Sequence, residues 1–232
     1  RKEYKMVGTV IKSGEPITKA IANSSILFTK QKIIDAKKLG FKYLNTGMIY
    51  RAITYYFVKN NILPNDINEI TNALSNINIY IKFDNDNQMV YVDNQDITPY
   101  VSSQEVQRNV SLYSQIFSIR EKITEIQRVF AQNNNIVVEG RDIGTHVFPN
   151  ADYKFFVTCN IEIRAKRRLD DLVKSGQNIT LDEVVNSLKN RDYIDTTREF
   201  SPLKRADDAI DIDTSNSTID ESVNEIIGYI RR

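Results

Sequence analysis

Runs of β-branched and aromatic residues alternate with stretches in which apolar residues recur every three or four positions. Four such runs predict buried strands, at 41–44, 136–138, 153–158 and 209–212. Helical spacing predicts helices at 48–60, 66–74, 103–131, 161–175, 181–190 and 219–230, and the end of another at 35–40. Strands that alternate with helices are typical of a parallel sheet. The pattern therefore predicts an α/β fold with its ligand loops at one edge of the sheet.

The segment between the predicted helices at 66–74 and 103–131 has a different pattern. Short alternating runs at 77–83 and 89–92 flank a stretch of Asp and Asn residues at 84–87. Alternation with a period of two indicates half-buried strands, and Asp and Asn favour a turn between them. We therefore expect a small antiparallel β insert here.

Composition narrows the function classes. The chain has 232 residues, and its 31 Lys and Arg against 30 Asp and Glu leave a formal net charge of +1. This balance gives no bulk attraction for a nucleic acid polymer, so an anion site must be local. The single cysteine, Cys159, excludes an internal disulfide and is expected to be buried as a small apolar residue. No stretch has the length of a membrane span, and we expect a cytoplasmic protein.

Charged side chains follow the predicted strand at 136–138. After Gly140 come Arg141 and Asp142, at the end of a strand where open α/β sheets hold ligands. The guanidinium fork suits phosphate oxygens. The alternative interpretation is a structural salt bridge between the two.

Two other segments also point to phosphate chemistry. Thr46 and Gly47 lie where a strand passes into a helix, with Arg51 one turn later, so that backbone amides can face an anion. An ordinary strand-to-helix turn is the alternative. Further on, Arg164, Arg167 and Arg168 form one cationic helix face, although the following aspartates would also suit a salt-bridged surface helix.

These motifs resemble those of bacterial cytidylate kinases. The resemblance rests on Asn-Thr-Gly-Met-Ile-Tyr-Arg at 45–51, Glu-Gly-Arg-Asp-Ile-Gly-Thr at 139–145 and Arg-Asp-Tyr-Ile-Asp-Thr-Thr-Arg at 191–198. A helical segment with Ser111 and Arg120 also matches. The similarity runs from residue 35 to the end of the chain.

The resemblance implies roles for individual residues. Arg51 would hold the monophosphate, Ser111 the ribose and Arg120 the cytosine. The implied substrate-binding set is Thr46, Tyr50, Arg51, Ser111, Arg120, Arg141, Asp142, Arg191, Asp195 and Arg198. Catalysis would fall to Arg141, Arg191 and Arg198, and ATP would be bound by Arg164, Arg167 and Arg168. No residue is implied as a metal ligand.

The resemblance also implies a fold and an activity. The fold is a three-layer domain like that of P-loop kinases, with a central parallel sheet of about five strands. A single domain over 1–232 would carry a monophosphate-binding β insert at about 77–100 and a helical lid at about 160–205. The activity is ATP-dependent phosphorylation of CMP or dCMP to CDP or dCDP, with Mg²⁺, by a monomer with no membrane or nucleic acid partner.

The sequence departs from the family pattern in two places. Asn45 replaces an Asp, which keeps the size of the side chain but removes its charge. The loop Gly-x-x-x-x-Gly-Lys-Ser/Thr, expected at about 22–29, is absent, and Phe28 stands where its Lys should be. Three interpretations stay open: a CMP-binding relative without catalysis, an amino-terminal segment that departs from the natural protein, and a divergent loop with the same task.

Overall fold

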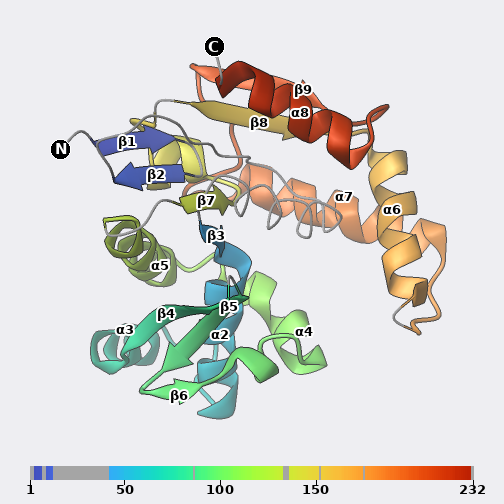
Figure 1. Cartoon of the computed structure of the whole chain (residues 1–232). Helices are drawn as coiled ribbons and strands as arrows, with labels where there is room; N and C mark the ends of the chain where they lie inside the picture. Colours follow the sequence, from blue (N-terminus) through green and yellow to red (C-terminus); the bar gives the residue numbers. More distant parts are fainter. Residues whose placement is uncertain are drawn as a thin grey trace. The chain divides into compact units, whose positions relative to one another are not determined.

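The computed structural model describes residues 3–6, 9–12, 42–85, 87–132, 136–151, 153–174 and 176–230. It divides into two compact units, of which unit 1 is Arg1–Tyr43 with Asn134–Arg232, and unit 2 is Leu44–Asn133 (Figure 1). The phosphate loop expected at 22–29 and the helix end expected at 35–40 lie outside the described residues.

Helices make up most of unit 2. Its elements, after strand β3 (Lys42–Asn45), are α2 (Thr46–Lys59), α3 (Ile67–Asn76), β4 (Ile79–Asp84), β5 (Asn87–Val92), β6 (Gln95–Asp96), η1 (Thr98–Tyr100), α4 (Gln104–Tyr113) and α5 (Phe117–Ala131). Ile49, Ile53 and Phe57 of α2 are fully buried, as their helical spacing predicts. The side chain of Asp66 accepts from Glu69 N–H and caps α3. The predictions of a strand at 41–44 and of these two helices are confirmed.

The predicted insert is a three-stranded antiparallel sheet in the order β4-β5-β6. Its hairpin pairs Ile79 with Val92 and Asp84 with Asn87. The rings of Tyr80 and Tyr91, opposite each other in that register, stack at 5.0 Å between centroids. The alternation at 77–92 therefore predicted both strands and their pairing.

The prediction of one helix at 103–131 is wrong, because α4 and α5 are separate helices. Ile116, the residue before α5, is extended with φ −74° and ψ 126°. The side chain of Arg120 reaches back to this break, and its Nη1 donates to Ser114 C=O at 3.0 Å. Tyr113 and Ile119 are buried on either side of the break at Ile116. The spacing of apolar residues therefore continues across the break, and only the backbone angles show that the helix is interrupted.

Unit 1 contains the remaining strands and three helices among its described residues. Its elements are β1 (Glu3–Met6), β2 (Thr9–Lys12), β7 (Ile136–Glu139), the π-helical turn η2 (Ile143–Val147), β8 (Lys154–Thr158), α6 (Ile161–Lys174), α7 (Leu181–Thr197), β9 (Ala209–Asp213) and α8 (Ile219–Ile230). β8 and β9 pair in parallel, β1 and β2 pair antiparallel, and β7 neighbours β3. Parallel strands joined through helices confirm the α/β class.

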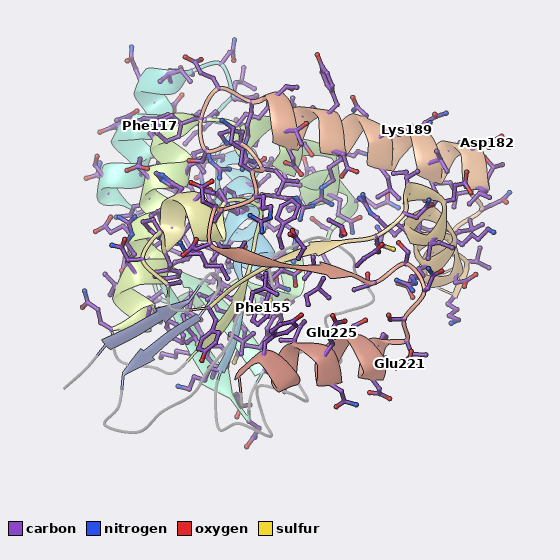
Figure 2. The ribbon with its side chains drawn as sticks, turned by 90° about the horizontal axis from the view of Figure 1, so that it is seen from above. Phe117, Phe155, Asp182, Lys189, Glu221 and Glu225 are labelled. Carbon is purple, nitrogen blue, oxygen red and sulfur yellow. The ribbon has the colours of Figure 1, made fainter. Side chains whose placement is uncertain are left out.

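The terminal helix α8 covers the parallel pair. Phe155 and Val157 of β8 and Ile212 of β9 form a buried cluster with Ile226 of α8. Figure 2 shows the ring of Phe155 on the side of β8 that faces α8, and its centroid lies 6.2 Å from that of Tyr229. This packing fixes β8 and β9, from whose carboxyl ends the neighbouring loops start.

Helix α7 is longer than predicted. The apolar spacing predicted 181–190, whereas the helix continues to Thr197. Arg191 and Asp195 are therefore helical, one turn apart, instead of lying in a loop, and Arg198 is the C-cap. The preceding helix α6 ends as predicted, with Gly176 at φ +82°, a conformation that favours glycine.

A reciprocal capping box begins α7. The side chain of Thr180 accepts from Glu183 N–H, and the Glu183 carboxylate accepts from both the Thr180 N–H and its hydroxyl at 2.7 Å. These bonds, the backbone one first, hold the pKa of Glu183 below its ordinary value of 4.5.

We predict that Glu183→Gln lowers Tm by about 1–3 °C near neutral pH, because the amide lacks the charge that the helix start stabilises. A lowered folded-state pKa stabilises the protein above 4.5, and this contribution is lost as the pH falls through the folded-state pKa. Thermal unfolding of the two proteins should therefore converge below 4.5. Glu225→Gln, within α8, is the control for removing an exposed carboxylate away from a cap; a constant gap for Glu183→Gln across pH would contradict the prediction.

Candidate functional site

The loop after β7 carries Arg141 and Asp142 at the end of a buried strand. Ile136 and Val138 are fully buried, and the Glu139 carboxylate accepts from the Tyr43 hydroxyl at 2.7 Å. Asp142 is only 6% exposed, and its C=O accepts the first hydrogen bonds of η2. The strand thus delivers both side chains to one place, as the sequence predicts.

Arg141 pairs with a carboxylate from another element. Its Nε donates to Asp195 Oδ2 at 2.7 Å, across 54 positions in the sequence. The two side chains are 14% and 13% exposed. The salt bridge expected with Asp142 as the alternative interpretation is therefore replaced by one with α7.

Asp195 is shared by three arginines. Besides Arg141, Arg198 donates Nη1 to Asp195 Oδ1 at 3.4 Å, and Arg191 Nε lies 3.9 Å from Asp195 Oδ2. Arg198 is nearly buried, whereas Arg191 is 59% exposed. The α7 residues predicted from the Arg-Asp-x-x-Asp-x-x-Arg motif are thus brought together with Arg141.

Arg198 also links Asp195 to Asp142. Its Nη2 lies 3.9 Å from Asp142 Oδ1, and its Nε donates to Ser201 C=O at 2.8 Å. We call Arg141, Asp142, Arg191, Asp195 and Arg198 the arginine cluster. Three guanidinium groups and two carboxylates leave one positive charge, which favours an anion such as phosphate.

The turn into α2 gathers three residues around Gly47. A Cβ at Gly47 would lie 3.0 Å from Arg51 Nη1 and 3.2 Å from Asn45 Oδ1, so the Arg51 guanidinium folds back over the helix start. Thr46 is 6% exposed. The position is thus more constrained than an ordinary strand-to-helix turn, and glycine leaves the space that Arg51 uses.

Nothing in the sequence indicated Gln88, a residue of β5 that binds the backbone of this turn. The side-chain amide of Gln88 forms hydrogen bonds with both the N–H and the C=O of Asn45, at 2.7 and 3.2 Å. A glutamine in an exposed-looking hairpin gives no signal in the sequence, because the contact depends on where the insert folds.

Arg120 and Tyr50 are also brought together within unit 2. Arg120 is 2% exposed, and its guanidinium lies 5.6 Å from the centroid of the Tyr50 ring, within cation–π range. Ser111 instead lies exposed on α4, where its C=O accepts from Ser114 Oγ and Gln115 Nε2.

The three arginines of α6 contact different groups. Arg164 makes a bidentate pair with Asp192 of α7, at 2.6 and 3.0 Å. Arg167 donates Nη2 to the C=O groups of Thr214 and Ser217. Burial lowers the pKa of Arg168, and Asp171 partly opposes that shift.

A cavity of about 590 Å³ lies at the carboxyl ends of β8 and β9. It is lined by Thr158, Cys159, Asn160, Glu162, Ile163, Asp213, Ser215 and Asn216. Hydrogen bonds from Ser215, its hydroxyl first, lower the pKa of Asp213. The prediction that Cys159 is buried is wrong: it is partly exposed at this cavity, and Arg167 Nη1 lies 3.5 Å from its sulfur.

The described part of the chain holds neither a metal-binding cluster nor a helix suited to a membrane. No group of three or more His, Cys, Asp and Glu side chains there is arranged to hold a metal ion. None of the helices that the structure describes combines the length and apolar character needed to cross a membrane.

The family model and the curated proteins that match this chain all carry the same description. A family model described as cytidylate kinase matches residues 29–232. A cytidylate kinase of Fusobacterium nucleatum is 44% identical over 197 residues, which is 85% of this chain and 88% of that protein. Cytidylate kinases of Clostridium botulinum strain Langeland and Clostridioides difficile are 42% and 41% identical, over 88% and 87% of this chain and 92% and 91% of their own lengths.

We predict a favourable coupling of about 2 kcal/mol between Arg141 and Asp195, since both are mostly buried and their hydrogen bond is charged. The free energies of unfolding of Arg141→Gln, Asp195→Asn and the double variant, from denaturant titration, measure it. The matched control is the pair Arg205 and Asp211, joined at 2.8 Å but 41% and 60% exposed, for which the coupling should be much smaller. Additive effects of the two substitutions in the arginine cluster would contradict the prediction.

Proposed function

The chain belongs to the cytidylate kinase family, and we propose that it transfers the terminal phosphoryl group of ATP to CMP or dCMP, giving CDP or dCDP. The observation that carries this function is the arginine cluster, in which the family's Gly-Arg-Asp and Arg-Asp-x-x-Asp-x-x-Arg motifs meet on the Asp195 carboxylate. Its remaining positive charge suits a phosphorylated substrate.

Direct transfer requires no covalent intermediate on the protein. The phosphoryl group passes through a loose transition state whose charge is spread over its equatorial oxygens. Guanidinium groups already oriented by Asp195 and by Ser201 C=O would stabilise that charge without reorganising. This is the role we propose for Arg141, Arg191 and Arg198.

Base selectivity is assigned to Asp142. Its carboxylate would accept from the exocyclic amine of cytosine, a donor that uracil lacks at that position. Because Asp142 is 6% exposed, a ligand without that donor would lose this hydrogen bond with little water to replace it. The contacts proposed for Thr46, Tyr50, Arg51, Ser111 and Arg120 stay predictions.

ATP is the phosphoryl donor of the proposed reaction. We place it at the cavity beside β8 and β9, because ligands of α/β proteins bind at the carboxyl ends of strands. Arg164 would then exchange the Asp192 carboxylate for a phosphate, while Arg167 would keep the loop at 214–217 in position. The phosphate loop expected at 22–29 falls outside the described residues.

Mg²⁺ would enter as the companion of ATP. It commonly binds through nucleotide phosphates and waters with few protein ligands. When bound, the ion neutralises phosphate charge. We further propose a cytoplasmic monomer with a single kinase domain, in which 77–100 serves as the monophosphate-binding insert and 160–205 as the lid.

The first test is turnover. We predict that the purified protein forms CDP from CMP only when ATP and Mg²⁺ are present, measured by separating the nucleotides after incubation. CMP binding is measured in parallel by calorimetry, with intact mass confirming the chain. Tight CMP binding without CDP formation would instead establish a CMP-binding relative that lacks phosphoryl transfer.

The second test is selectivity. We predict that Asp142→Ala lowers the ratio of kcat/KM for CMP to that for UMP by about tenfold or more, because the carboxylate reads the cytosine amine. Asp182→Ala removes an exposed carboxylate at the start of α7 and is the control. An unchanged ratio in a folded Asp142→Ala protein would remove Asp142 from the base site.

A further inference from the structure

Gln88 of the insert makes an unusual contact with the main chain. Its Oε1 accepts from Asn45 N–H at 2.7 Å and its Nε2 donates to Asn45 C=O at 3.2 Å, although the residues are 43 positions apart. A carboxamide presents an acceptor and a donor side by side. The two bonds therefore satisfy both backbone groups of one residue, as a neighbouring strand would.

Asn45 is the junction between β3 and α2. It has extended angles, φ −83° and ψ 96°, and its own side chain makes no capping bond to α2. A residue at this place normally gains rigidity from a side-chain cap. Here the side chain of Gln88 holds the junction instead.

A displacement of this junction would reach Arg51. The space above Gly47 is bounded by Asn45 Oδ1 on one side and Arg51 Nη1 on the other, at 3.2 and 3.0 Å from an ideal Cβ. Glycine leaves this space open, and the Asn45 and Arg51 side chains both border it. We therefore expect a shift of the Asn45 backbone to change where the Arg51 guanidinium lies.

Gln88 is itself held by the body of unit 2. It pairs with Phe83 across the hairpin, and the Phe83 ring stacks on Phe130 of α5 at 5.5 Å. Strand β5 contacts α2 directly, as the ribbon also shows (Figure 1). A series of contacts thus runs from α5 through the hairpin to the turn before Arg51.

We infer that Gln88 is a positioning residue of the acceptor site, which fixes the Asn45 to Gly47 turn so that Arg51 meets the monophosphate of the substrate. The identity of that ligand rests on the proposed function; the contact between Gln88 and Asn45 does not. The β insert then supports the phosphate-binding turn.

The test replaces Gln88 by Met, which keeps the length of the side chain but forms neither hydrogen bond, and by Ala. KM for CMP should rise about tenfold, because a displaced Arg51 would lose about one well-made hydrogen bond to the phosphate, whereas kcat and KM for ATP stay within about twofold. Gln95→Met, an exposed glutamine of β6 in the same sheet, is the matched control and should leave all three constants unchanged. Thermal unfolding checks that each variant is folded.

Amide hydrogen exchange gives a readout that needs no turnover. We expect the Asn45 N–H to lose protection in Gln88→Met but not in Gln95→Met, whether or not the wild-type protein forms CDP. A wild-type protein that forms no CDP would contradict the proposed function and leave this inference standing. Unchanged protection at Asn45 would overturn the inference, as would KM values for CMP and ATP that rise together. A KM for CMP within twofold of wild type would also overturn it.

Discussion

The arginine cluster depends on the ion pairs that the Asp195 carboxylate forms with Arg141 and Arg198. Arg141 and Arg198 are mostly buried, and guanidinium groups held close together repel each other unless a negative charge lies between them. Asp195 supplies that charge from α7 and bonds both. The extension of α7 to Thr197 is what brings the carboxylate into position.

In unit 2 the group that holds the site residues is neutral: the carboxamide of Gln88. The site residues of this unit lie around a backbone junction, where the groups that need partners are an N–H and a C=O. A carboxamide satisfies both without adding charge beside Arg51, whereas an ionised carboxylate in the place of Gln88 would offer no donor to the Asn45 C=O. On the proposed function, each unit therefore orients its arginines before substrate binds, one with an ion pair and the other with amide hydrogen bonds.

The arginines Arg164 and Arg167 of α6 already bind groups of the protein itself. Arg164 is paired in a bidentate manner with Asp192, and Arg167 bonds the C=O groups of the loop after β9. Binding of ATP phosphates by Arg164 would have to compete with that pair, so only the difference between the two interactions would contribute to ATP affinity. Arg167 has a structural task already, which is to hold the loop beside the cavity.

Local periodicity determined most of the elements. The strands at 136–138, 153–158 and 209–212 and the antiparallel insert follow from burial on one or both faces of the chain, which the order of apolar residues records directly. The resemblance then placed Arg141, Asp142, Asp195 and Arg198 in one site, and within unit 1 they do lie together.

The sequence by itself therefore determined most of the strands and helices and which motifs carry charge. The tertiary structure alone decided the partners: Asp195 instead of Asp142 for Arg141, Gln88 for the Asn45 backbone, and the partly exposed place of Cys159. It also decided the break before α5 and the far end of α7. The physical reason is that periodicity reports the burial of each residue along its own element, whereas these contacts join residues 43 and 54 positions apart, whose distance depends on how the elements fold together.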